Sequence, residues 1–238
     1  MKPLIQLSVL CITVCLRLST VQAAEGSRPP IGKILFLGNS ITSHAPLAKI
    51  DWAGNWGMAA SGEEKDYVHL VLRSLAPASG KRPEAMILNI AAFERDPAGY
   101  DLREKHKAAF DFNPDVVVLA IGENVPALKT SADKEQFKAS VLQVLRALQT
   151  RHKPAILVRS CFWADRSKDE VLKQASEEAG GIFVDISSLA KDESNYARSE
   201  RKFRNSSVAK HPGDKGMQAI ASALITAMKT NGLLAKTE

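Results

Sequence analysis

The stretch Lys33-Ile34-Leu35-Phe36-Leu37-Gly38-Asn39-Ser40 decides the fold. Its apolar residues run on without polar alternation, which is typical of a parallel strand that is covered on both faces. The glycine that follows predicts a tight turn, which lifts the Ser40 hydroxyl out of the sheet. In open α/β sheets, side chains that follow strands in this way gather at the carboxyl edge, where ligands bind.

Four further apolar runs have strand length, and between them lie longer segments with apolar residues at helical spacing, as in 137–148 and 217–228. A capping box at Ser61–Glu64 predicts that one helix begins there. The alternation indicates an α/β protein, a three-layer α/β/α sandwich with a mainly parallel five-stranded sheet. Two long loops, Ser43–Ala60 and Ser187–Lys210, are expected to carry function. The further predicted strands are Ala85–Ile90, Val116–Ile121, Ala155–Val158 and Ile182–Ile186.

The N-terminal residues are expected to lie outside the fold. A positive start at Lys2, an apolar stretch and small residues at Val21-Gln22-Ala23 are typical of a secretory signal peptide. We therefore predict a signal peptide over 1–23, a linker over 24–32 and one domain over 33–238, in a protein that is exported to the periplasm or secreted. The roughly 215 residues that remain suit a single core.

Charge and cysteine content narrow the function. The formal net charge is +6, but Lys and Arg are interspersed with Asp and Glu, and the basic cluster Arg198–Arg204 contains Glu200. We interpret that cluster as a solvated loop rather than an anion-binding patch, and we expect no nucleic-acid partner and no membrane partner after signal cleavage. Cys161 is the only cysteine beyond the signal peptide, so no intramolecular disulfide is possible.

Three polar residues at the ends of predicted elements can carry chemistry. Ser40 follows the first strand, and Asn124 follows Val116–Ile121, where its amide can donate to a developing oxyanion. His211 precedes the C-terminal helix and, with an ordinary pKa of about 6.5, can accept a proton from a serine. Each also has a structural interpretation: Ser40 as a helix cap, Asn124 as a turn cap and His211 as a surface histidine.

Taken together, these motifs resemble the SGNH/GDSL hydrolase family. The resemblance rests on Gly38-Asn39-Ser40-Ile41 after the first strand, Gly122-Glu123-Asn124 after a middle strand and His211-Pro212-Gly213 before the last helix, and it spans Lys33–Leu234. It implies a flavodoxin-like fold, a serine nucleophile at position 40, a histidine base at position 211 and no cofactor. It also implies an oxyanion hole formed by Asn124 and the Ser40 backbone amide.

Two departures from the family concern the turn and the oxyanion hole. The family's Gly-Asp-Ser reads Gly-Asn-Ser here, and Asn39 can still form turn hydrogen bonds. The family's oxyanion glycine is missing after the second strand. Because only an amide is needed, the backbone N–H of Ala92, or that of Phe93, is the candidate donor.

A third departure concerns the acid that normally orients the histidine. The family places Asp three residues before it, and this chain has Val208 there. A main-chain carbonyl, Asp185 or Asp214 can take over the orienting role. Loss of the third triad member usually slows catalysis without abolishing it, because the oxyanion hole and substrate binding remain.

Candidate substrate contacts lie near Ser40 in the sequence. Asn39 and Trp56 are assigned to substrate binding together with His44, which lies four residues after Ser40 and is otherwise a solvated loop histidine. Trp52, Trp56 and Trp163 form either an aromatic wall suited to sugar rings or a set of core anchors.

We interpret the chain as an exported serine ester hydrolase that removes small acyl groups, such as acetyl, from carbohydrate esters through an acyl-enzyme. A glycan- or ligand-binding protein with weakened catalysis is the alternative that Val208 and the missing glycine favour. A lipase or lysophospholipase is a further alternative. The histidines show no metal-ligand spacing, and no glycine-rich phosphate loop follows a strand.

Overall fold

The computed structural model describes residues 31–76, 82–151 and 153–234. The predicted signal peptide, 1–23, lies outside the described residues, as does the predicted linker up to residue 30. One five-stranded sheet has the order β2-β1-β3-β4-β5, and every pair of neighbouring strands is parallel. All five predicted strands are present. Their bounds are β1 (Lys33–Gly38), β2 (Glu84–Asn89), β3 (Val116–Ala120), β4 (Ala155–Arg159) and β5 (Ile182–Val184).

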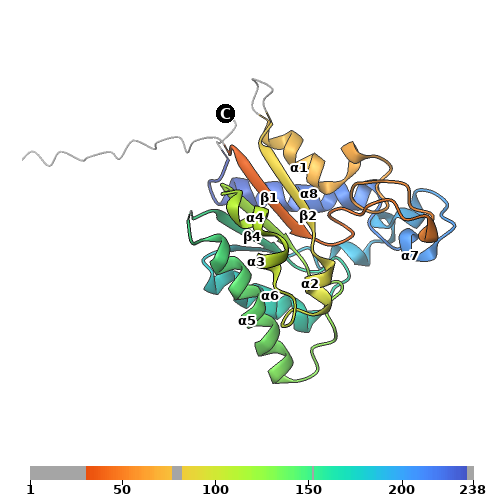
Figure 1. Cartoon of the computed structure of the whole chain (residues 1–238). Helices are drawn as coiled ribbons and strands as arrows, with labels where there is room; N and C mark the ends of the chain where they lie inside the picture. The colour runs from red at the N-terminus through yellow and green to blue at the C-terminus, as the bar shows by residue number, and fades with distance from the viewer. Residues whose placement is uncertain (1–30, 77–81, 152, 235–238) are drawn as a thin grey trace, which may run out of the picture.

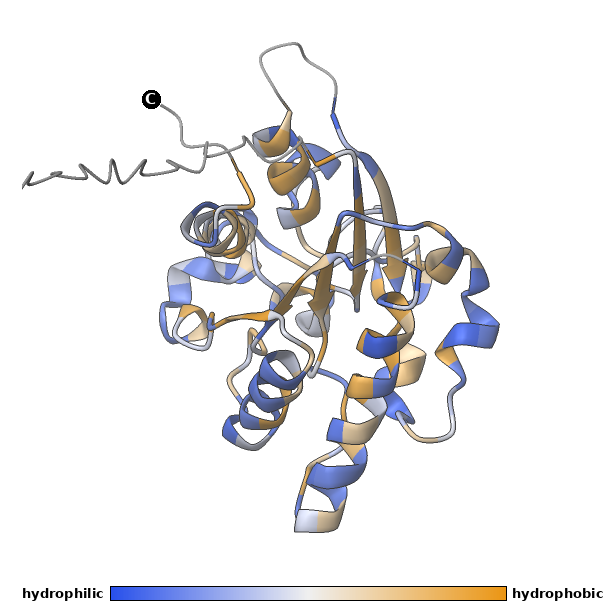
Figure 2. Cartoon of the chain, turned by 90° about the vertical axis from the view of Figure 1, so that its left-hand side faces the viewer, coloured by the Kyte–Doolittle hydropathy of each residue, from blue (hydrophilic) through white to orange (hydrophobic). Residues whose placement is uncertain are grey.

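Helices cover both faces of the sheet, as predicted (Figure 1). One face packs against α1 (Tyr67–Leu75) and α8 (Asp214–Thr230), and alternate β1 residues such as Phe36 point into that layer. Leu35 and Leu37 point to the opposite layer. Figure 2 shows the resulting pattern, in which apolar strands lie inside and amphipathic helices surround them. The opposite layer consists of α2 (Ala91–Arg95), α3 (Leu102–Lys105), α4 (Lys107–Asp111), α5 (Ser131–Leu148) and α6 (Arg166–Glu178).

The strand register brings the candidate site together. Gly38 at the end of β1 pairs with Asn89 at the end of β2 and with Ala120 at the end of β3. The segments that follow these three strands therefore begin at one level, at the carboxyl edge of the sheet. Ser40 and Asn124 lie on two of these segments.

The two long loops pack against each other at this edge. The first contains one short 3-10 turn (Ala48–Ile50), and the second contains three such turns followed by α7 (Ser206–Ala209). Trp52 and Met58 from the first loop share a buried apolar cluster with Ala197 and Val208 from the second. This contact fixes the segment that leads into His211.

The predicted capping box at Ser61–Glu64 is wrong. Helix α1 begins at Tyr67, and the side chain of Asp66 caps it by accepting a hydrogen bond from the His69 amide at 2.8 Å. The Ser61 hydroxyl donates instead to Asp214 at the start of α8, at 2.5 Å.

Within the three described ranges, no helix is both long and apolar enough to cross a membrane.

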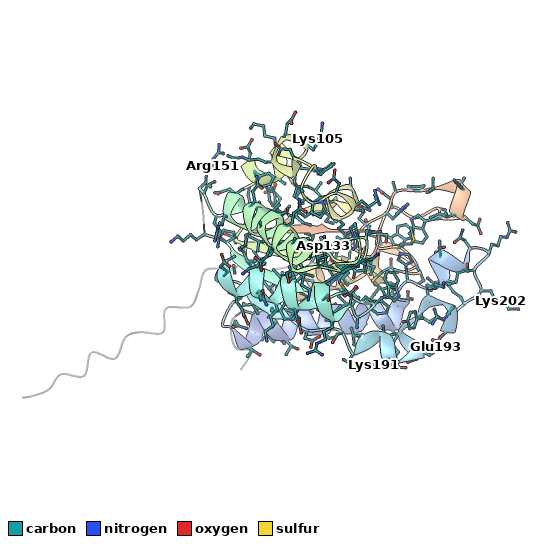
Figure 3. All side chains as sticks on the ribbon, turned by 90° about the horizontal axis from the view of Figure 1, so that it is seen from below. Lys105, Asp133, Arg151, Lys191, Glu193 and Lys202 are labelled. Carbon is teal, nitrogen blue, oxygen red and sulfur yellow. The ribbon has the colours of Figure 1, made fainter. Side chains whose placement is uncertain are left out.

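The surface carries charges of both signs. Figure 3 shows Lys191, Glu193 and Lys202 on the segment between β5 and α7, and all three are exposed. In the basic cluster Arg198–Arg204, the Arg198 guanidinium donates two hydrogen bonds to Glu193, at 2.6 and 2.7 Å. Arg201 forms an ion pair with Glu200 in the same segment.

Candidate active site

Ser40 lies in a tight turn that directly follows β1. The amides of Thr42 and Ser43 donate to the Asn39 carbonyl at 2.9 and 3.0 Å. The turn passes so close to Gly38 that a Cβ there would lie 1.9 Å from the Thr42 hydroxyl oxygen. No helix begins directly after Ser40, so the alternative interpretation of Ser40 as a helix cap is wrong, and the turn alone presents the serine hydroxyl at the sheet edge.

His211 meets Ser40 from the other end of the chain. The Ser40 hydroxyl oxygen lies 2.8 Å from His211 Nε2, and His211 Nδ1 lies 2.9 Å from the carbonyl oxygen of Ser207. A carbonyl can only accept, so Nδ1 carries the ring proton. Nε2 is then left as the acceptor for the serine proton, which is the tautomer that general-base catalysis needs.

The group that orients His211 is therefore a main-chain carbonyl, that of Ser207, which confirms one of the three alternatives given for this role. Val208, at the position where the family has Asp, is 1% exposed and belongs to the apolar cluster of the two loops. Asp185 accepts a hydrogen bond from the Ser187 amide, and Asp214 accepts one from the Ser61 amide. Both ring nitrogens of His211 are occupied by Ser40 and Ser207, so the assignment of either aspartate to His211 is wrong.

The surroundings of His211 favour its neutral form. Burial lowers the pKa of the imidazole, and the backbone hydrogen bond to Ser207 opposes this shift without cancelling it. The Trp163 ring stands edge-on to the imidazole, with centroids 5.3 Å apart and planes at 86°. A neutral imidazole at neutral pH is competent as a base.

Asn124 enters the site from the end of β3. Gly122 begins this turn with φ of 127°, and a Cβ at that position would lie 2.4 Å from Cys161 Sγ. Only glycine adopts this conformation without strain, so the turn toward Asn124 depends on it. Asn124 Nδ2 donates one hydrogen bond to Glu94 Oε2 at 2.6 Å. An amide nitrogen has two protons, so a second N–H remains for a substrate oxygen.

A buried polar network lies directly beneath these residues. Asn39 Nδ2 donates to Glu94 Oε1 at 3.1 Å and to Glu123 Oε2 at 2.6 Å. Arg159 donates to the other oxygen of Glu123 at 2.6 Å, and Asn39, Glu94 and Arg159 are all fully buried. Asn39 was expected to contact substrate. The structure instead places it under the site, with both of its amide protons used.

The two buried glutamates differ in their electrostatics. Burial raises the pKa of Glu94, and the negative charge of Glu123 raises it further. Burial acts in the same direction on Glu123, but the Arg159 charge and its hydrogen bond outweigh it and lower the pKa of that carboxyl. The network therefore holds one paired carboxylate and one whose charge depends on the N–H groups around it.

The remaining predicted residues lie around the same edge. Ala92 is the second residue of α2, where a helix N–H has no acceptor within the helix. The His44 amide donates to the Trp56 carbonyl at 2.9 Å, and the Trp56 ring packs edge-on against Trp52 at 5.7 Å. The Trp56 indole N–H donates to Ala60. The substrate roles of His44 and Trp56, and the oxyanion role of Ala92, stay predictions.

Sequence reasoning missed Glu94, Glu123 and Arg159. The signal was present, because each charged residue lies at or just after a predicted apolar strand, in or near a segment expected to be buried. Charged side chains in such places are almost always paired. Burial also raises the pKa of Cys161, so its thiol stays protonated, as expected for a packing residue.

Several solved structures have the same arrangement of strands and helices. A protein described as a GDSL-like lipase from Bacteroides uniformis ATCC 8492 aligns with a TM-score of 0.52 and 12% identity, over 84% of this chain and 96% of the other. The chain has the fold of the GDSL-like lipases. This SGNH fold is the one expected from the resemblance in the sequence. No family model matches the chain, and no curated protein matches it by sequence.

Two larger proteins contain a domain with this SGNH fold. The salicylyl-acyltransferase SsfX3 from a tetracycline biosynthetic pathway aligns with a TM-score of 0.56 and 15% identity, over 86% of this chain and 56% of its own. A family two carbohydrate esterase from Clostridium thermocellum aligns with a TM-score of 0.50 and 16% identity, over 85% of this chain and 65% of its own. The chain thus spans less than two thirds of either protein.

Proposed function

We propose that this chain is a serine ester hydrolase with Ser40 as nucleophile and His211 as base. The observation that carries the proposal is the hydrogen bond of 2.8 Å between the Ser40 hydroxyl and His211 Nε2, in a histidine whose Nδ1 is held by the Ser207 carbonyl. The two residues are 171 positions apart in the chain, so the fold has brought them together at the carboxyl edge.

In the proposed reaction, Ser40 Oγ attacks the ester carbonyl while His211 Nε2 takes the hydroxyl proton. The oxyanion is stabilised by the free N–H of Asn124, with the backbone amides of Ser40 and Ala92 as further donors. Collapse breaks the bond to the alcohol oxygen, which receives the proton from Nε2, and leaves an acyl ester on Ser40. Water then attacks this ester with His211 again as base, which releases the carboxylic acid and restores Ser40.

The Ser207 carbonyl replaces the family's aspartate in only part of its role. It fixes the tautomer and the ring orientation of His211, as the acid does in a triad. A neutral carbonyl stabilises the imidazolium less than a carboxylate does. We therefore expect measurable turnover at a rate below that of enzymes with a complete Ser-His-Asp triad.

For the substrate we propose a small acyl ester of a carbohydrate. Trp163 lies beside the His211 ring and is half-buried, which leaves part of an aromatic surface next to the reacting atoms. Leu47 is the one exposed large hydrophobic residue in the described part of the chain, which favours a polar substrate over a lipid. A carbohydrate esterase with the same fold supports the carbohydrate part of this proposal. Export through the predicted signal peptide is part of this proposal.

Hydrolysis of p-nitrophenyl acetate by the mature protein tests the reaction class. Ser40→Ala and His211→Ala are expected to abolish turnover, while Ser131→Ala on the exposed start of α5 and His106→Ala between α3 and α4 leave it unchanged. Equal rates in wild type and Ser40→Ala would contradict the proposal. Acetylated xylo-oligosaccharides are the next substrates, and binding of them without turnover would favour the ligand-binding alternative.

A further inference from the structure

Glu94 is a buried carboxylate that is surrounded by N–H donors. Its Oε1 accepts from Asn39 Nδ2 at 3.1 Å, from the Gly122 amide at 2.6 Å and from the Asn124 amide at 3.4 Å. Its Oε2 accepts from Asn124 Nδ2 at 2.6 Å. It lies on α2 and ties that helix to the turn after β1 and to the turn after β3.

This pattern restricts the orientation of the Asn124 side chain. An ionised carboxylate has no proton to donate, so only the nitrogen of the Asn124 amide can face it. If the amide rotated by half a turn, its oxygen would meet the carboxylate, and two acceptors would lie in contact in a buried site. The contact to the Asn124 backbone N–H sets the position of the residue as well as its orientation.

We propose that Glu94 is a positioning residue, which holds the Asn124 amide so that its second N–H is available to the oxyanion. The inference rests on the proposed function, because it requires that Asn124 donates to a substrate oxygen. Glu94 itself touches no reacting atom. It acts on the reaction through Asn124.

The N–H donors around Glu94 favour its ionised form, whereas burial and the Glu123 charge oppose it. Asn39 presents one proton to Glu94 and the other to Glu123, so it separates the two carboxylates. Glu123 turns its other oxygen toward Arg159 and the Phe162 amide. Arg159 thereby neutralises Glu123, which leaves Glu94 with a set of neutral N–H donors.

The kinetic test combines Glu94→Gln with Asn124→Ala. In Glu94→Gln, the new amide group faces the Asn124 amide, and the asparagine is expected to rotate. Loss of a single oxyanion donor costs about 10²–10³-fold in kcat, so we expect Glu94→Gln to lower kcat by about 10–100-fold with little change in KM. The double variant is expected to have the same kcat as Asn124→Ala alone. A further loss in the double variant that equals the loss in the single variant would overturn the proposal.

A matched control removes a carboxylate at the start of β3, at the opposite end of that strand from Asn124. Asp115 precedes β3 and accepts from the amides of Gly32 and Lys33, both at 2.8 Å. Asp115→Asn is expected to lower stability but to keep the wild-type kcat. If Asp115→Asn lowers kcat as much as Glu94→Gln does, the effect comes from the loosened fold and the proposal fails.

A measurement on the wild-type protein separates this inference from the proposed function. In ¹⁵N-edited NMR spectra, one Asn124 side-chain proton is expected to lie downfield and to exchange slowly, because it is held by Glu94, while the other exchanges faster. Two protons that both exchange at the rate of free amide would overturn the positioning role, whether or not the protein hydrolyses esters. If the NMR pattern is found but no turnover depends on Ser40, the proposed function fails, whereas the positioning of the Asn124 amide by Glu94 is supported.

Discussion

Substitution of Asn39 by Asp restores the Gly-Asp-Ser sequence of the SGNH family, and we predict that it damages this protein. Asn39 has no solvent exposure, and its two amide protons are donated to Glu94 and Glu123 at 3.1 and 2.6 Å. The carboxylate introduced by Asn39→Asp would have no proton for either glutamate. It would place a third acid in a buried space where two acids already share a single amide group.

The magnitude follows from the two hydrogen bonds. Bonds to charged groups contribute about 1.5–3 kcal/mol each, so their loss is expected to lower the free energy of unfolding by about 3–6 kcal/mol at pH 8. A single domain has only about 5–15 kcal/mol in total. To limit repulsion, the folded variant retains a proton among its three carboxyls, whose pKa is raised above that of unfolded Asp or Glu.

The sign of the pH dependence is fixed by that retained proton. Because the folded variant binds more protons than the unfolded chain, its stability falls as pH rises from the ordinary carboxyl pKa through the raised one. The deficit relative to wild type is therefore expected to be smaller at pH 5 than at pH 8.

Urea unfolding at both pH values measures these differences, with Asn205→Asp as the matched control. Asn205 caps α7 through its side-chain oxygen, which accepts from Ser207 and Val208. Asp is an equally good cap, so the control is expected to change stability by less than about 0.5 kcal/mol. Equal stability of Asn39→Asp and wild type at pH 8 would refute the reasoning about the buried network.

Three further predictions concern His211, Val208 and Gly122. Burial lowers the pKa of His211, and catalysis needs its neutral imidazole. In a pH–rate profile, kcat/KM should therefore rise with pH through a midpoint below the ordinary histidine pKa of about 6.5. A midpoint above that value would contradict the prediction. Val208→Asp should lower the free energy of unfolding by about 3–5 kcal/mol in urea titrations, because Val208 is buried among apolar residues. It should not raise kcat, because His211 Nδ1 already has the Ser207 carbonyl as its acceptor. A stable variant with a higher kcat would show that Ser207 is a poor substitute for the acid. In thermal unfolding, Gly122→Ala should lower the free energy of unfolding by about 2–4 kcal/mol, because the added Cβ would lie 2.4 Å from Cys161 Sγ. The control Gly180→Ala has φ of 70° but open space around it, so it should lower stability by about 1 kcal/mol. Equal losses of stability in the two variants would refute the steric argument.

The fold could be predicted from the sequence because its signals are local. The run Ile34–Leu37 is apolar at every position, since Phe36 faces the layer of α1 and α8 while Leu35 faces the opposite one. Such a run indicates a strand buried on both faces. The start of α1 was misplaced because Ser61–Glu64 matches a capping box, whereas Ser61 is bonded to Asp214, far away in the chain.

The candidate site was only partly predictable, because some of its contacts join residues that are far apart in the sequence. Ser40, Asn124 and His211 follow or precede recognisable elements, so their positions at the sheet edge could be inferred. The partners of Asn39 are 55 and 84 positions away, and although charged residues after apolar strands indicate buried, paired groups, no local pattern shows that Asn39 is the partner. The Ser207 carbonyl is a backbone atom, and every residue has one, so the sequence could suggest that a carbonyl replaces the aspartate but could not identify which one.

The most direct test of the central claim is covalent labelling of the mature protein with a fluorophosphonate, which reacts with activated serines. Intact mass and peptide mapping are expected to show one adduct, on Ser40. Labelling should be absent in Ser40→Ala and much slower in His211→Ala, because His211 Nε2 accepts the proton of Ser40. A wild-type protein that stays unlabelled, or that is labelled at another serine, would contradict the assignment of Ser40 and His211 as the catalytic pair.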